Sequence, residues 1–317
     1  MVMESILSQE EFRKEMSEER RITFELLDNQ TRKVLTDPGE FTALLNMLAQ
    51  GTATTVSNTL LVQAQFPSAT AVLPRDDWEA KGLDIIQDDR GYYPLGIRQF
   101  AVNGEYQGKD GKPHTRYKVY KGFDAAQTTN PELARQLTAP QRPSKVFINA
   151  DPLYTMNRAL FEASPIECIP YKPQLFIDPA ENITEETGVK YIPETHTVVI
   201  RKVPQELWYR ALTYEIALGL YHREEGSRFS REKHGLDAAV IAYLLSRRMG
   251  LSNVSFSMDS RQMPIDHPLP EFRWRMQKCM DLTQTLYHRV TEKLKRLQAP
   301  VPNHQHGEFF REAVISR

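Results

Sequence analysis

The chain has 317 residues, of which 40% are hydrophobic and 26% are charged, and its formal net charge at pH 7 is -1. This composition is ordinary for a folded globular protein and excludes a chain that binds nucleic acid through a general excess of positive charge, so any polyanion site has to be local. The N-terminal residues contain no apolar stretch of signal-peptide length, and the apolar run Ala238 to Leu245 is too short to cross a bilayer. We therefore expect a cytoplasmic protein without a membrane partner. The two cysteines, Cys168 and Cys279, lie far apart and predict reduced thiols.

The chain begins with a charged segment, residues 1–35, whose weak helical pattern predicts a surface helix or an arm. Asp37 and Pro38 then form a clear helix start, because aspartate caps a helix and proline suits its first position. Glu40 has the spacing that completes a capping box. A second helix is predicted over residues 56–65.

The remainder of the first half changes from helical to β-like patterns. A short helical turn is predicted around Trp78. Residues 96–102 and 116–123 alternate aromatic or branched side chains with polar ones around a turn-rich segment, which predicts a long hairpin. We assign residues 36–137 to a first domain and the proline-containing segment 138–144 to a linker.

A second domain is predicted over residues 145–299, followed by a tail at 300–317. Its predicted elements are a helix over 152–162, a strand over 197–201, and helices over 205–223, 234–249 and 274–297. The expected fold class is therefore α+β, with two domains of which the second is mainly helical.

The segment ALTYEIALGLYH, residues 211–222, has the frame of a zinc-protease helix without its metal ligands. The protease signature His-Glu-x-x-His works because residues four apart project from one helix face and bind one ion together. Here Tyr214 and Leu218 stand at the histidine positions, and only Glu215 remains. The helix is apolar nearly all round and predicts a buried position, where an ionised glutamate needs a partner.

The surrounding order of segments resembles the zincin-type metallopeptidase domain of ArdC-type antirestriction proteins. The resemblance rests on VVIRKVPQELWYRALTYEIALGLYH followed, after about ten polar residues, by LDAAVIAYLLSRRMGL. In that family the second helix supplies a third, glutamate ligand, and Ala239 stands at that position here. The resemblance thus implies a degenerate metal site in which all three ligand positions, Tyr214, Leu218 and Ala239, are lost and Glu215 is vestigial.

The first half resembles the single-stranded-DNA-binding module that precedes this peptidase domain in the same family. The resemblance rests on TVSNTLLVQAQFPSAT, which contains Asn58, on Trp78, on GIRQFAV and on YKGFDAAQT, in that order. Where relatives carry a lysine- and glycine-rich turn, this chain has IIQDDRGYYPL, and Asp88 and Asp89 would repel phosphates.

Local positive charge is confined to the predicted hairpin. Residues 1–140 contain 16 Lys and Arg against 20 Asp and Glu, a formal charge of -4, which argues against strong nonspecific DNA binding. Within residues 109–123, however, cations alternate with aromatic residues, as in single-strand-binding surfaces. The alternative is a solvated hairpin whose aromatic residues face the core. The predicted nucleic-acid-binding set is Lys109, Lys112, Arg116, Tyr117, Lys118, Tyr120, Lys121 and Asn58.

The sequence thus predicts a non-catalytic binding protein of a mobile genetic element, without a cofactor, metal or catalytic residue. Its expected partner is single-stranded DNA or a host defence protein complex. One alternative is a metal-dependent peptidase with a site rearranged around Glu215, His222, His234 and Asp237, although their spacing matches no known ligand set. Another is a protein inhibitor that uses the acidic surface of the first half to occupy a nucleic-acid-acting defence enzyme.

Overall fold

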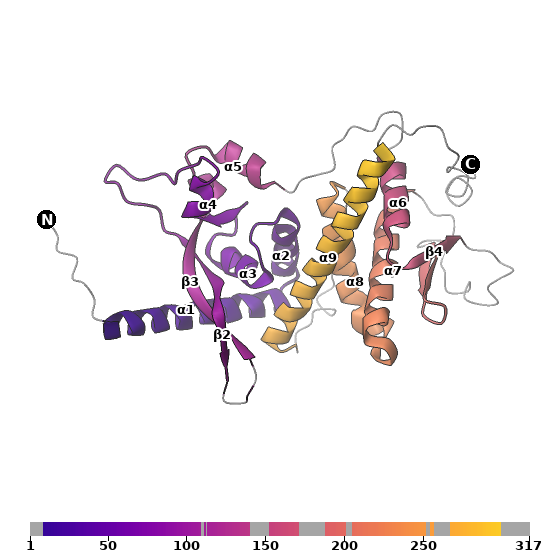
Figure 1. Ribbon diagram of the computed structural model, residues 1–317, viewed down its shortest axis with the longest axis horizontal. Coiled ribbons are helices and arrows are strands. Elements are labelled where there is room, and N and C mark those ends of the chain that lie inside the picture. The colour runs from indigo at the N-terminus through magenta and orange to yellow at the C-terminus, as the bar shows by residue number, and fades with distance from the viewer. Residues whose placement is uncertain are drawn as a thin grey trace. The chain divides into compact units, whose positions relative to one another are not determined.

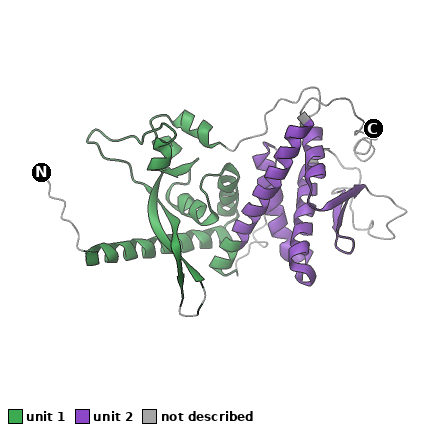
Figure 2. Ribbon diagram, in the orientation of Figure 1, with its two compact units in different colours: residues 1–140, 257–274 green, residues 141–256, 275–317 purple. Residues whose placement is uncertain are grey.

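The computed structural model describes residues 9–108, 111, 113–139, 152–170, 188–200, 205–251, 254–256 and 267–298 (Figure 1). These residues form helices and two small sheets, so the expected α+β class is confirmed. The chain divides into two compact units: unit 1 comprises residues 1–140 and 257–274, and unit 2 comprises residues 141–256 and 275–317 (Figure 2). Each unit is described by itself.

Unit 1 begins with three helices, α1 (Gln9–Thr36), α2 (Pro38–Gln50) and α3 (Val56–Gln65). The second half of α1 packs against α2 and α3 and buries side chains such as Leu27 and Val34. Asp37 caps α2 as predicted, accepting hydrogen bonds from the backbone N–H groups of Gly39 and Glu40. Glu40 does not complete a capping box, because the backbone N–H of Asp37 donates to the carbonyl of Lys33 at 2.9 Å. One oxygen of the Glu40 carboxylate instead accepts hydrogen bonds from the side-chain amides of two glutamines, Gln30 at 3.0 Å and Gln63 at 2.8 Å.

The sheet of unit 1 is antiparallel in the order β1-β3-β2. Its strands are β1 (Val72–Pro74), β2 (Ile97–Gln107) and β3 (Pro113–Asp124), and β2 with β3 forms the predicted hairpin. The turn at Trp78 is helix α4 (Arg75–Glu79), and the buried indole donates a hydrogen bond to the carbonyl of Phe123. The unit also contains the 3-10 helix η1 (Ala125–Gln127) and helix α5 (Pro131–Thr138).

Unit 2 combines a small mixed sheet with long helices. Its strands are β4 (Glu167–Pro170), β5 (Val189–Ile192) and β6 (Thr197–Ile200), in the order β4-β6-β5, with β4 parallel and β5 antiparallel to β6. Its helices are α6 (Pro152–Ala163), α7 (Gln205–Glu225), the short η3 (Gly226–Arg228), α8 (Arg231–Arg248) and the part of α9 (Leu269–Gln298) that follows Trp274.

Helix α7 is the centre of unit 2, since it contacts α6, α8 and the sheet. Gly219 allows the close approach to the sheet: a Cβ atom there would lie 3.0 Å from side-chain atoms of both Ile166 and Tyr191. The helix is buried on most of its circumference, as its apolar sequence predicts. The segment ALTYEIALGLYH is therefore a core helix.

The described elements match most of the predicted ones. Strands β1, β4 and β5 and helix α5 were not predicted, and residue 138 of the predicted linker is the last residue of α5. The remainder of that linker from residue 140, and the tail at 300–317, lie outside the described residues. Among the residues that the structure describes, none of the helices is both long enough and apolar enough to span a bilayer.

Candidate functional site

Glu215 on α7 is buried and fully occupied by internal partners, as the sequence predicted for a remnant of a metal site. Its side chain is 6% exposed. Both carboxylate oxygens accept hydrogen bonds from the guanidinium of Arg231, at 2.8 and 2.7 Å, and the backbone N–H of Tyr191 donates a third at 2.7 Å. Arg231 also donates to the carbonyl of Tyr191 at 3.3 Å. The carboxylate is thus neutralised by an internal cation.

The pKa values of the neighbouring groups fit this arrangement. Burial by itself would lower the pKa of Arg231, but the hydrogen bonds and the negative charge of Glu215 outweigh burial and raise it. Burial, followed by the charge of Glu215, raises the pKa of Tyr214. Tyr214 therefore stays a neutral phenol, and its hydroxyl lies against Gly235 in the first turns of α8.

The three positions that carry metal ligands in the resembled family do not form a donor set here. Leu218 is completely buried in the core, and Ala239 lies half-buried on α8, which packs on α7. Neither side chain has an atom that coordinates a metal, and catalytic zinc requires three protein donors. These residues therefore do not fit a catalytic zinc ion.

The four residues of the rearranged alternative are each engaged elsewhere. While Glu215 pairs with Arg231, Asp237 accepts a hydrogen bond from Arg275 at 3.0 Å. His222 contacts the hydroxyl of Tyr191 at 2.8 Å, and His234 lies 3.2 Å from a carboxylate oxygen of Glu225. Within the described part of the chain, no group of three His, Cys, Asp or Glu residues is placed to hold a metal ion.

Arg231 is the residue that the sequence analysis missed. It stands at the start of α8, after the Ser230 cap and 16 residues from Glu215, so helix periodicity gives no link between the two. The one available signal was the need of a buried glutamate for a cation. The sequence contains many arginines, and only the structure shows that Arg231 is the partner of Glu215.

In unit 1, Asn58 is structural. It is 2% exposed, its side-chain N–H donates to the carbonyl of Phe100 at 3.0 Å, and its side-chain oxygen accepts from the N–H of Phe100 at 2.8 Å. Gln65, two helical turns later on α3, makes the same pair of hydrogen bonds to Arg98, both at 3.0 Å. These amides satisfy the backbone along the outer edge of β2. Asn58 is thus engaged by the backbone of β2, and its role in nucleic-acid binding stays a prediction.

The predicted cations and aromatic residues of β3 are divided between two faces of the hairpin, because successive strand residues point to opposite faces. Arg116, Lys118 and Tyr120 share one face, which we call the Lys118 face, with Tyr106 of β2. Its Arg116 guanidinium lies 5.5 Å from the Tyr106 ring, and the Tyr120 hydroxyl donates to Gln99. Lys109 and Lys112 lie outside the described residues.

The opposite face of the hairpin, the Lys121 face, carries Lys121 and Tyr117. It is partly covered by α1, since the ring of Phe24 lies 4.5 Å from that of Phe100, which in turn contacts Tyr117 at 5.9 Å. Glu19 of α1 also lies 3.8 Å from Arg98 on this face. Among the described residues of the hairpin, the Lys118 face carries two cations, Arg116 and Lys118, without an acidic partner, beside the exposed ring of Tyr106.

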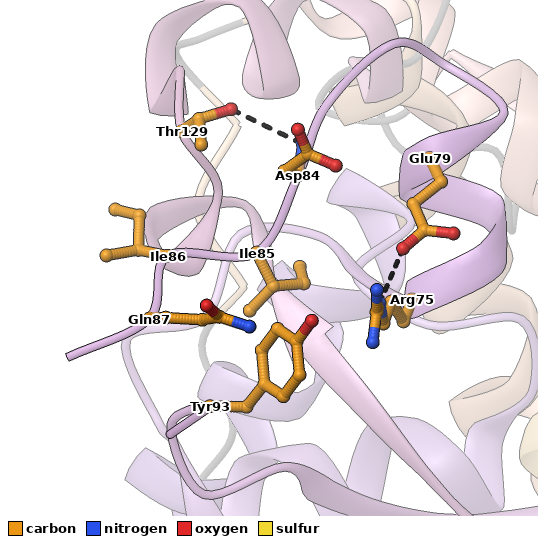
Figure 3. Close-up of a pocket in the computed structure, with 8 residues that line it drawn as sticks. All are labelled: Arg75, Glu79, Asp84, Ile85, Ile86, Gln87, Tyr93 and Thr129. Atoms are coloured by element: carbon orange, nitrogen blue, oxygen red, sulfur yellow. Dashed lines mark hydrogen bonds and ion pairs between the residues drawn. The ribbon is translucent and has the colours of Figure 1, made fainter. Parts of the chain in front are cut away.

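A second surface of unit 1 is acidic and aromatic. A hollow of about 380 Å³ lies beside the segment 84–95, with Arg75 over the ring of Tyr93 at 4.5 Å and paired with Glu79 (Figure 3). Asp88 braces this segment by accepting hydrogen bonds from the N–H groups of Arg90 and Tyr92. The exposed residues around it include the acidic Asp76, Asp77, Glu79, Asp84, Asp88 and Asp89, the apolar or aromatic Ile86, Tyr92, Tyr93 and Leu95, and the cations Arg75, Lys81 and Arg90.

These features define a class: an α+β protein with a buried glutamate paired to an arginine on a core helix, and a hairpin that carries cations. No protein-family model matches the chain, and no curated protein matches it. Among solved structures, it is similar to the metal-free antirestriction protein ArdC from plasmid R388, with 17% identity and a TM-score of 0.50 over 86% of this chain and 98% of that one. The Mn(II)-bound ArdC structure matches with 14% identity and a TM-score of 0.45, over 80% of this chain and 97% of that one. The chain therefore has an ArdC-like fold along most of its length.

Proposed function

We propose that this chain is an antirestriction protein that acts by binding and not by hydrolysing peptides. The ArdC-like fold supports the antirestriction role. The observation that carries the non-catalytic part is the pairing of Glu215 with Arg231. In a metallopeptidase, the glutamate acts as a general base on a metal-bound water. In this chain, Glu215 is held by two hydrogen bonds from Arg231, and the nearby Leu218 and Ala239 have no metal-binding atoms.

The proposed ligand is single-stranded DNA, bound by the hairpin of β2 and β3. Arg116 and Lys118 supply positive charge for phosphates. The partly exposed ring of Tyr106 stacks with that of His114 at 5.6 Å, and this aromatic pair supplies a surface for a base. The acidic composition of the rest of unit 1 restricts the contact to this hairpin. Because the attraction is mainly electrostatic, the affinity should fall steeply with added salt.

The experiment is a fluorescence-anisotropy titration of a labelled single-stranded oligonucleotide with the purified chain, run beside a transfer assay of unmodified plasmid into restricting cells. The variant is Lys118→Glu with Lys121→Glu, and the control is Arg228→Glu, an exposed cation of unit 2. The double variant should lose DNA binding and protection together. Protection that survives loss of DNA binding would refute the DNA-binding mechanism.

The acidic surface around residues 84–95 favours a second candidate, an inhibitor that occupies the nucleic-acid site of a defence enzyme. Exposed aromatic residues on a braced segment, ringed by carboxylates, complement a cationic protein surface. In that case Asp88→Lys with Asp89→Lys would abolish protection while leaving DNA binding unchanged. The two sets of variants therefore separate the two candidates.

A further inference from the structure

Five aromatic rings form a continuous stack at one end of α7, and three of them are imidazoles. His196 lies 4.6 Å from His222, His222 lies 4.8 Å from Phe229, Phe229 lies 5.4 Å from His234, and His234 lies 4.7 Å from Tyr221, measured between ring centroids. His196 belongs to the turn between β5 and β6, whereas the other rings belong to α7, α8 and the link between them. The stack therefore holds this turn onto the helices.

The outer two imidazoles share one hydroxyl group. The oxygen of Tyr191 lies 3.1 Å from Nδ1 of His196 and 2.8 Å from Nδ1 of His222. A phenol hydroxyl donates one proton and accepts through its lone pairs, so it can donate to one Nδ1 and accept from the other. Both partners are then satisfied when the two imidazoles are neutral and carry their protons on opposite nitrogens.

The inner imidazole, His234, faces a hydrogen-bond acceptor at each of its ring nitrogens. Nδ1 of His234 faces the backbone carbonyl of Ser230 at 2.9 Å, and Nε2 faces the Glu225 carboxylate at 3.2 Å. Both neighbours only accept hydrogen bonds. His234 thus has a separate partner at each ring nitrogen, whereas the outer two imidazoles share a single partner.

We propose that His196, His222 and Tyr191 form an acid-sensitive latch, which holds the turn between β5 and β6 on α7 and opens when both imidazoles are protonated. Two imidazolium rings at 4.6 Å repel each other, and both Nδ1–H groups would then donate to one oxygen. His196 also has a positive φ of 55°, a conformation that costs energy for a non-glycine residue and that the latch has to maintain.

The pKa shifts of His222 and Tyr191 also favour a latch that is closed at neutral pH and opens in acid. Burial, followed by the charge of His196, lowers the pKa of His222, and Glu194 in the turn only partly opposes this. On β5, burial raises the pKa of Tyr191, which keeps the shared hydroxyl protonated. Because the folded protein disfavours the charged form of His222, the latch should be fully stable above the ordinary histidine value of about 6.5 and weaken as the pH falls below it.

Opening the latch should also affect the Glu215 site. The side chain of Tyr191 holds the two histidines, while its backbone N–H and carbonyl bond Glu215 and Arg231. Acidification would therefore loosen the strand that positions the buried ion pair. This inference concerns regulation of unit 2 and does not depend on DNA binding.

The first test uses the unaltered protein labelled with ¹³C and ¹⁵N at its histidines. At pH 8, NMR should show His196 and His222 as neutral rings with opposite tautomers, and His222 should titrate below the ordinary value of about 6.5. Identical tautomers, or independent titration of both rings at the ordinary value, would overturn the proposal.

The second test is hydrogen exchange of the backbone amides of residues 194–196 at pH 7.5 and pH 5.5, corrected for intrinsic rates. Exchange should accelerate at pH 5.5 in the unaltered protein. His196→Asn, which tolerates a positive φ, should remove this pH dependence, whereas His288→Gln on α9 should retain it. An unaltered protein without pH dependence, or a His196→Asn protein that keeps it, would contradict the latch.

Discussion

At the scale of single residues, the most informative feature is the buried ion pair of Glu215 and Arg231. A buried carboxylate needs a positive partner, and in this chain the guanidinium of Arg231 supplies it through two parallel hydrogen bonds. The carboxylate thus acts as a structural group that ties α7 to β5 and α8.

This view predicts a cost for removing the arginine alone. Arg231→Leu leaves a buried negative charge with one hydrogen bond, so the free energy of unfolding should fall by about 2 to 3 kcal/mol, less than for a fully buried pair because Arg231 is 40% exposed. Urea denaturation measures the change. Arg228→Leu, an exposed neighbour, is the control and should change the free energy by less than about 0.5 kcal/mol. Equal effects of the two variants would show that the ion pair is not important for stability.

Asn58 gives a second prediction at this scale. Asn58→Leu keeps the approximate size of the side chain but removes both hydrogen bonds to the backbone of Phe100, so the free energy of unfolding should fall by roughly 2 kcal/mol. Asn103→Leu, at an exposed position of the same strand, is the control. If Asn58 instead contacted DNA, its replacement would weaken binding without lowering stability.

At the scale of elements, the sequence predicted helices and strands well where local chemistry determines them. The Asp37 cap and the apolar period set α2, and α3 has the predicted bounds of residues 56–65. The sequence could not predict which partners buried polar groups choose. Glu40 has the spacing of a capping box, yet the N–H of Asp37 bonds the carbonyl of Lys33 at the end of α1, and the Glu40 carboxylate bonds glutamines of α1 and α3.

The hairpin illustrates the same limit for the candidate binding site. The alternation of cations with aromatic residues was visible in the sequence, but the register with β2 and the cover by α1 distinguish its two faces. A strand residue and its neighbour cannot both face one ligand. Which face is available is a property of the fold and was not predictable from the strand alone.

Because Lys118 and Lys121 lie on opposite faces of the hairpin, their contributions to DNA binding can be measured separately. Lys118→Glu should weaken binding of single-stranded DNA by at least tenfold and reduce its salt dependence, because the charge lies beside Arg116 and Tyr106 on the Lys118 face. Lys121→Glu should have a much smaller effect, since α1 partly covers its face. Anisotropy titrations at several salt concentrations measure both. The reverse order of effects would assign the site to the Lys121 face.

At the scale of the whole molecule, the chain combines an ArdC-like fold with side chains that do not form a metal-binding set at positions 214, 218 and 239. Unit 1 presents acidic residues around residues 84–95, and unit 2 has tyrosine, leucine and alanine at those three positions. Packing of a core helix depends mainly on apolar volume, so it does not require metal ligands. A fold of this kind can therefore persist while its chemistry changes.

The last prediction tests whether unit 2 still has the geometry of a metal site. The unaltered protein should bind no stoichiometric zinc and show no metal-dependent peptidase activity, because its ligand positions lack donors. Tyr214→His, Leu218→His and Ala239→Glu together should create zinc affinity, since positions 214 and 218 lie four apart on α7 and α8 packs against that helix. Adding Arg231→Gln should strengthen zinc binding by removing a competing cation beside Glu215.

Binding of zinc should raise the melting temperature, as for any ligand of the folded state. Elemental analysis after dialysis, with Leu218→His alone as the control, measures the bound ion. Absence of zinc from a folded quadruple variant would show that these positions do not converge, and one tightly bound zinc in the unaltered protein would contradict the non-catalytic proposal.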